Sequence, residues 1–302
     1  MALVLLWREG SLGNVVDAAR GADPVATVSG FGLYLVGLAL LCYRWHLLVL
    51  MTKGRSQLAR AAEAFLTSVV INYAAPVGLA VPTRAALTKR ALGLSAGETG
   101  AVAFWEIVSD VAVLGIGTAL WLAITTGSVG AVAGTVGASG VRVLAGMLGA
   151  LVLLALAVWM LPALRTRVAK LAAGAIEYPR ARPLAAVSVL AVSAVYWMMQ
   201  GVVLALLLDA FGATTDGRVV LGLISLPVLV GMLSPVPGGA GVREALMVAV
   251  ADLQGAGHAS VLVAAVTYRV ALFAAIPVLY IMVRLWLMTA NRRASEPTMS
   301  EG

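Results

Sequence analysis

The chain has 302 residues, of which 61% are hydrophobic and only 12% are charged, and its mean hydropathy is +0.98. Soluble domains carry about 25% charged residues, so this composition excludes a soluble globular enzyme and indicates a polytopic membrane protein. The net charge of +7 arises from basic residues in short loops between apolar segments, so we expect no nucleic-acid partner. The one cysteine, Cys42, can form no internal disulfide, and the sequence predicts neither a metal site nor a cofactor.

In chain order, the first apolar segment covers only residues 2–7, and we interpret it as the end of a helix that begins upstream of this start. Five later runs are long enough to span a bilayer, near 25–51, 97–126, 142–162, 184–208 and 259–289. We therefore predict an all-α fold, with a single integral membrane domain over 1–302 that ends in a short tail at 290–302.

Two further apolar runs, near 61–82 and 218–242, contain helix-breaking residues. Proline removes a backbone donor and glycine lets the chain turn sharply. Backbone that is not helical is tolerated in a bilayer only where protein or a wet cavity surrounds it. The predicted breaks are at Asn72, Pro76, Gly78, Pro235, Pro237, Gly238, Gly239 and Gly241.

Loop charges predict the topology, because loops rich in lysine and arginine remain in the cytoplasm. Basic residues follow the first span, fill the loop at 163–183 and occur in the tail, whereas the loops at 127–141 and 209–217 have none. We therefore predict a multi-pass protein of the plasma membrane with a cytoplasmic C-terminus. The chain is then cytoplasmic both before residue 61 and near residue 95, and outside both before residue 218 and near residue 257. Segments 61–94 and 218–257 must therefore enter and leave the membrane on the same face, as re-entrant hairpins from opposite faces. The alternative, two complete kinked spans, would move the 163–183 loop outside.

The two interrupted segments resemble each other. Residues 76–87 (PVGLAVPTRAAL) and 235–246 (PVPGGAGVREAL) share five of twelve residues at an offset of 159. The same offset maps the first span onto the fourth and 97–126 onto the last. Together with the opposed hairpins, this predicts an inverted repeat with broken helices near the midplane. Repeat 1 covers about 25–127, repeat 2 about 184–289, and the helix at 142–162 links them.

Ionisable residues inside apolar segments are costly, so they usually face a cavity or each other. Glu106 and Asp110 are four residues apart and share one helical face. Asp110 maps onto Arg269 at the repeat offset, so we predict that Arg269 pairs with Asp110 and Glu106 across the repeat interface. The alternative is that the two carboxylates are structural counter-ions only.

Other charges flank the predicted breaks. Arg84 maps onto Arg243, which is followed by Glu244. A helix that begins near 241 would present N-terminal amides that attract phosphate, beside these arginines. Arg84 could instead anchor the topology at an interface. We expect Arg44 to extend to the cytoplasmic headgroups, as arginines near helix ends do.

Several motifs occur together in order: RW at 44–45, N-x-x-x-P-x-G at 72–78, LGLSAGET at 92–99, E-x-x-x-D at 106–110, PxPGGxGxRE at 235–244 and YR at 268–269. Together they resemble the transmembrane domain of lysylphosphatidylglycerol synthase and its stand-alone relatives, over about 25–289. The resemblance implies a role in moving aminoacylated phospholipid between leaflets, and related proteins occur with polyprenyl-linked sugar pathways. This chain has Glu106-Ile107 where members usually have Glu-Arg, and we expect no soluble aminoacyltransferase domain within these 302 residues.

The sequence leads to two main hypotheses. The first is a flippase- or scramblase-like translocase, not an enzyme, that moves an anionic, aminoacylated or polyprenyl-linked phospholipid. Its partners would be this lipid and the membrane, and it could form a homo-oligomer. The second is a membrane-embedded enzyme or accessory subunit that acts on lipid-linked sugars; a weaker third is an ion-coupled solute carrier. For the first hypothesis the predicted substrate-binding residues are Arg84, Arg243, Glu244, Arg269, Glu106 and Asp110.

Overall fold

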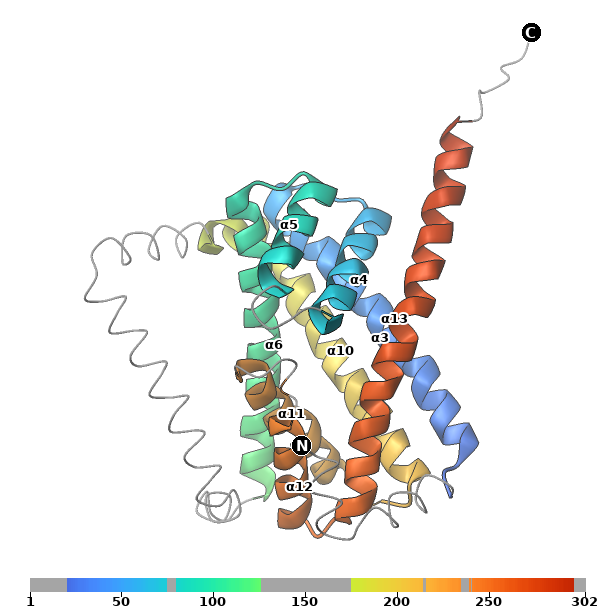
Figure 1. Ribbon diagram of the computed structural model, residues 1–302. Coiled ribbons are helices and arrows are strands. Elements are labelled where there is room, and N and C mark those ends of the chain that lie inside the picture. The colour runs from blue at the N-terminus through green and yellow to red at the C-terminus, as the bar shows by residue number, and fades with distance from the viewer. Residues whose placement is uncertain are drawn as a thin grey trace.

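The protein is described from a computed structural model, drawn in Figure 1. The structure describes residues 21–74, 80–125, 175–213, 216–234, 239 and 241–295. Within these ranges every long regular element is a helix, which confirms the all-α prediction. The predicted linking helix at 142–162 and the apolar segment at 2–7 lie outside the described residues.

Four of the described helices include segments long and apolar enough to cross a membrane. They are α3 (Pro24–Lys53), α6 (Ala96–Thr125), α10 (Pro183–Ala210) and α13 (His258–Ser295). At 1.5 Å per residue, 28 to 30 residues extend over about 42–45 Å, more than the hydrocarbon core of about 30 Å. Apolar side chains such as Ile116 and Leu184 are exposed on these helices, as expected where lipid is the solvent. Four of the five predicted spans are therefore confirmed.

The ends of these helices have local causes. Pro24 and Pro183 stand in the first turns of α3 and α10, where a backbone N–H would have no intrahelical partner. The side chain of Asp23 accepts a hydrogen bond of 2.9 Å from the backbone N–H of Val25 and so caps α3. Gly54 ends α3 in the left-handed region, with a φ of 79°.

Cations from distant segments complete two helix C-termini. Lys53 Nζ donates to the backbone carbonyls of Leu92, at 2.8 Å, and Gly93, at 2.6 Å, at the end of α5. Arg182 Nη1 donates to the carbonyl of Met51 at 2.7 Å, near the end of α3. The last carbonyls of a helix have no intrahelical partner and carry partial negative charge, so these contacts are favourable.

Four shorter helices form two pairs. In the first, α4 (Leu58–Ala74) packs against α5 (Ala80–Leu92); in the second, α11 (Gly217–Leu233) packs against α12 (Val242–Leu253). The two pairs lie at opposite ends of the bundle, in cyan and in brown in Figure 1. The gap in each pair falls at a predicted break, although Pro76, Gly78, Pro235, Pro237 and Gly238 themselves lie outside the described residues.

Two glycines between α11 and α12 adopt backbone conformations that other residues avoid. Gly239 has a φ of 63° and Gly241 a φ of 84°. A Cβ on Gly239 would lie 2.6 Å from the backbone Cα of Gly231, so this connection is pressed directly against α11. Glycine is needed here for its backbone angle and for its lack of a side chain.

The packing of the helices follows the sequence offset. Pro24 and Pro183 begin equivalent helices 159 residues apart, and α4 and α11 have matching bounds at the same spacing. The first half, α3 to α6, meets the second half, α10 to α13, along α3 and α10. These two helices are antiparallel, since the N–H of Asp23 donates to the carbonyl of Ala210 at 3.1 Å and Arg182 reaches Met51 at the other end. In addition, α4 packs on α13 and α11 packs on α6.

Candidate functional site

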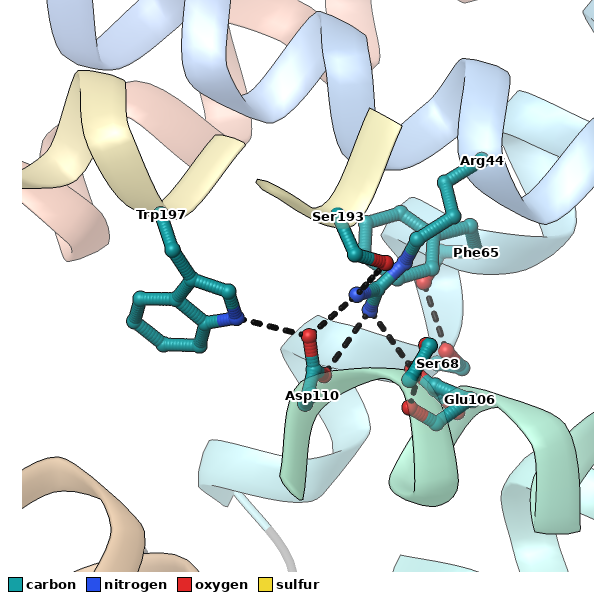
Figure 2. A network of polar contacts seen from close by, with 8 residues as sticks. Arg44, Phe65, Ser68, Glu106, Asp110, Ser193 and Trp197 are labelled. Carbon is teal, nitrogen blue, oxygen red and sulfur yellow. Dashed lines mark hydrogen bonds and ion pairs between the residues drawn. The ribbon is translucent and has the colours of Figure 1, made fainter. Parts of the chain in front are cut away.

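A buried ionic network joins α3, α6 and α10 (Figure 2). The Arg44 guanidinium faces the Asp110 carboxylate with both terminal nitrogens: Nη1 donates to Oδ1, and Nη2 donates to Oδ2 at 3.1 Å. Nη1 also donates to Ser193 Oγ at 3.1 Å. Arg44 is 3% exposed and Asp110 6% exposed, so the pair lies in the interior of the described helices. Such a two-pronged contact is the strongest form of an arginine–carboxylate pair.

Two more side chains complete this network, which we call the Arg44 cluster (Arg44, Glu106, Asp110, Ser193 and Trp197). Trp197 Nε1 donates to Asp110 Oδ1 at 2.8 Å. Glu106 Oε1 lies 3.7 Å from Arg44 Nη2. The cluster joins two helices of the first half to α10 of the second half, and it therefore holds the halves together in one arrangement.

Two sequence predictions are wrong here. Asp110 pairs with Arg44 and not with Arg269, and Arg44 is buried and does not extend to the headgroups. The physical reason is packing between helices: α10 covers this part of α3, and Asp110 on α6 and Ser193 on α10 hold the guanidinium inside the bundle. A buried guanidinium needs a carboxylate partner, and α6 supplies it.

A second group of polar side chains lies where α12 meets α13, and we call it the Arg243 cluster (Gln200, Gly241, Arg243, Glu244, Tyr268 and Arg269). Glu244 Oε1 pairs with Arg269 Nε at 2.6 Å. The other oxygen, Oε2, accepts a hydrogen bond of 2.7 Å from the backbone N–H of Gly241, which caps α12. Glu244 is 7% exposed, so both of its oxygens are engaged in a largely dry site.

Arg243 has a different environment. Its guanidinium carbon lies 5.0 Å from the centre of the Tyr268 ring, a cation–π contact. The Tyr268 hydroxyl donates to Gln200 Oε1 at 2.5 Å, and the ring meets Tyr34 edge-on at 5.2 Å between ring centres. Among the residues that the structure describes, no carboxylate pairs with Arg243.

The structure brings the predicted residues together in two sets. Arg243, Glu244 and Arg269 meet at α12 and α13, and Glu106 and Asp110 meet at Arg44. The contacts of the remaining predicted side chains are outside the described part of the structure: Arg84 lies on α5 and Asn72 lies on α4.

Sequence reasoning missed the polar side chains that α10 supplies to both clusters. On α10, Ser193, Trp197 and Gln200 are spaced i, i+4 and i+7, so they share one helical face. Ser193 and Gln200 are each 0% exposed. A polar stripe at helical spacing in an otherwise apolar span was the available signal, because a membrane helix buries such groups against partners.

Comparison with protein families matches residues 1–279 to the family described as the lysylphosphatidylglycerol synthase TM region. No curated protein gives a match to this chain. The matched range contains all four short helices and every residue of both clusters. The protein therefore belongs to the family of the lysylphosphatidylglycerol synthase transmembrane region.

Proposed function

We propose that the protein is a lipid translocase that moves an anionic, aminoacylated or polyprenyl-linked phospholipid between the leaflets of the plasma membrane. The observation that carries the proposal is Arg243, a half-buried cation that pairs with no carboxylate among the described residues of a lipid-related membrane domain. Charges inside membrane segments usually pair or mark a substrate pathway. A lipid phosphate is an anion that arrives from the surrounding bilayer.

The arrangement of the helices supports an inverted repeat. The two short-helix pairs lie at opposite ends of the bundle, and each half contributes a short helix that packs on the last helix of the other half. In transporters of this kind, broken helices meet near the midplane and one repeat rocks against the other. In this proposal α4–α5 and α11–α12 are the re-entrant hairpins, and a headgroup passes between them while its tails stay in lipid.

The two clusters have separate tasks in this mechanism. Arg243 binds the headgroup phosphate, since a planar guanidinium matches two phosphate oxygens. Arg84, its counterpart at the repeat offset, serves the same purpose on the other hairpin. The Arg44 cluster is a fixed frame for α3, α6 and α10, because the carboxylate of Asp110 already accepts hydrogen bonds from Arg44 and Trp197. No residue in this scheme is catalytic.

The proposed orientation places the C-terminus in the cytoplasm, with the end of α3 and the start of α10 on the same side. Single cysteines at Arg55 and at Asp216, in a Cys42→Ala background, test it with an impermeant thiol reagent on intact cells. Labelling at position 216 and protection at position 55 is the expected result. The reverse pattern would invert the topology.

The function is tested with purified protein in vesicles that contain fluorescent phospholipid. A reagent that bleaches only the outer leaflet removes about half of the signal when lipid does not move. We expect bleaching well beyond half, and a strong reduction with Arg243→Ala. Bleaching that stops at half for every lipid, together with a chemically altered lipid, would support the second hypothesis of an enzyme or accessory subunit.

A further inference from the structure

The carboxylates of the two clusters are already engaged by the protein. Asp110 accepts from Arg44, and Glu106 lies 3.7 Å from the same guanidinium. Glu244 pairs with Arg269. Arg243 is therefore the cluster cation without a carboxylate among the described residues, and the Arg243 cluster, with two arginines and one glutamate, carries a net positive charge.

Glu244 is poorly suited to recognise a cationic headgroup. One oxygen is 2.6 Å from Arg269 and the other is 2.7 Å from the N–H of Gly241. An incoming ammonium group would have to compete with Arg269 for a carboxylate that is only 7% exposed. Glu244 was predicted from the sequence as a substrate-binding residue, but these two contacts leave it poorly placed to bind a cationic headgroup.

The same contacts describe what Glu244 does instead. A backbone N–H at the start of a helix and an arginine together form an anion position, and the protein fills this one with its own carboxylate. The sequence predicted that the N-terminal amides of α12 attract a phosphate. The N–H of Gly241 already donates to Glu244, so this amide does not bind the phosphate. In the Arg243 cluster, Arg243 is then the group that binds the anion.

Arg243 is well positioned for that role. Tyr268 lies under its guanidinium, and Tyr268 is itself fixed by a hydrogen bond to Gln200, which is 0% exposed. A cation–π contact leaves the N–H groups of a guanidinium able to bind two phosphate oxygens. Three helices, α10, α12 and α13, thus hold one cation in place.

We propose that the Arg243 cluster takes the phosphate of a net-anionic lipid headgroup and provides no carboxylate for the ammonium group of an aminoacylated one. This inference rests on the translocase function proposed above and narrows its substrate class. The family match concerns a domain of a synthase for a cationic lipid, so the charge preference is a specific statement about this chain.

The test compares two lipids in the same vesicles, phosphatidylglycerol with a net charge of about −1 and lysylphosphatidylglycerol with a net charge of about +1, each labelled on an acyl chain. We expect the anionic lipid to move about tenfold faster or more, the size of effect that one charged hydrogen bond provides. Arg243→Ala should abolish this preference and Arg243→Lys should keep part of it. Arg218→Ala is the matched control, since that exposed arginine on α11 lies in neither cluster.

Glu244→Gln distinguishes two roles of the Glu244 carboxylate, a structural role in holding Arg269 and α12 and a role in binding a cationic headgroup. If Glu244 only holds Arg269 and caps α12, the substitution changes the movement of both lipids by the same factor. Selective slowing of the cationic lipid by Glu244→Gln, or a wild-type rate for that lipid equal to or above the anionic rate, would overturn the inference.

Two further arms separate this inference from the function on which it rests. If neither lipid moves, the translocase proposal fails. The charge preference is then tested by the equilibrium retention of the two lipids by the protein in detergent micelles. Retention of phosphatidylglycerol that depends on Arg243 supports the preference, and equal retention of both lipids refutes it. Uptake of labelled inorganic phosphate without lipid movement would assign the anion site to a free phosphate and overturn the lipid version.

Discussion

The Arg44–Asp110 pair gives the sharpest test of how the bundle is held together. Asp110→Ala removes the acceptor of two hydrogen bonds from Arg44 and one from Trp197, and it leaves a guanidinium that is 3% exposed. Removing one partner of a buried pair costs about 3–5 kcal/mol. Glu106, at 3.7 Å from Arg44, can compensate in part, so we expect the lower end, about 3 kcal/mol. For a chain of this size that lowers Tm by roughly 6–12 °C.

The chain contains its own reporter for this measurement. Cys42 is its single cysteine and is 5% exposed, so a thiol-reactive dye added to detergent-solubilised protein reports unfolding during a temperature ramp. Asp209→Ala, an exposed acid on α10, is the control and should shift Tm by less than about 2 °C. The double variant Arg44→Met with Asp110→Leu should recover most of the loss, since apolar residues of similar size replace buried pairs well. An Asp110→Ala protein that melts within about 2 °C of the wild type would refute this account of the cluster.

Two further predictions concern other helix contacts. Gly239→Ala should destabilise the protein by well over the roughly 1–2 kcal/mol of a left-handed alanine, because its Cβ would also lie 2.6 Å from Gly231. The control is Gly212→Ala, which has a φ of 68° and open space around the new Cβ, so it measures the cost of the backbone conformation alone. Equal Tm losses for the two variants would contradict the close approach of Gly239 to Gly231. Glu63 and Arg284 pair between α4 and α13, and the Arg284 side chain is 54% exposed. Exposed ion pairs contribute little to stability, so Glu63→Lys should lower Tm only slightly, and adding Arg284→Glu should restore it. Failure of the exchange to restore Tm would argue against a pairwise contact.

Much of the helical framework could be predicted from the sequence, because membrane solvent imposes length and hydropathy on each span. The helices α3, α6, α10 and α13 follow from runs of apolar residues long enough to cross the bilayer. Proline and glycine likewise indicated where α11 would stop short of α12. These are local signals, and they do not depend on which helix packs against which.

The pairing of charges could not be predicted in the same way. Equivalence at an offset of 159 placed Asp110 and Arg269 at related positions, but related positions need not touch. Each of the two pairs instead within its own half: Asp110 on α6 with Arg44 on α3, and Arg269 on α13 with Glu244 on α12. The packing of α3 against α10 buries Arg44, and no single helix contains that information.

The separation of Arg44 from its partners along the chain has a consequence for biosynthesis. Asp110 is made 66 residues after Arg44, and Ser193 is made 149 residues after it. At about 5–20 residues per second, α3 waits roughly 3–13 s before the carboxylate exists. During that interval an arginine within the span opposes insertion by about 2.5–3.5 kcal/mol. The helix α3 must therefore enter the bilayer with a charge whose partner has yet to be translated. Its 30 residues have a mean hydropathy of 2.0 in their most apolar window, and this hydropathy offsets the cost of inserting Arg44 alone.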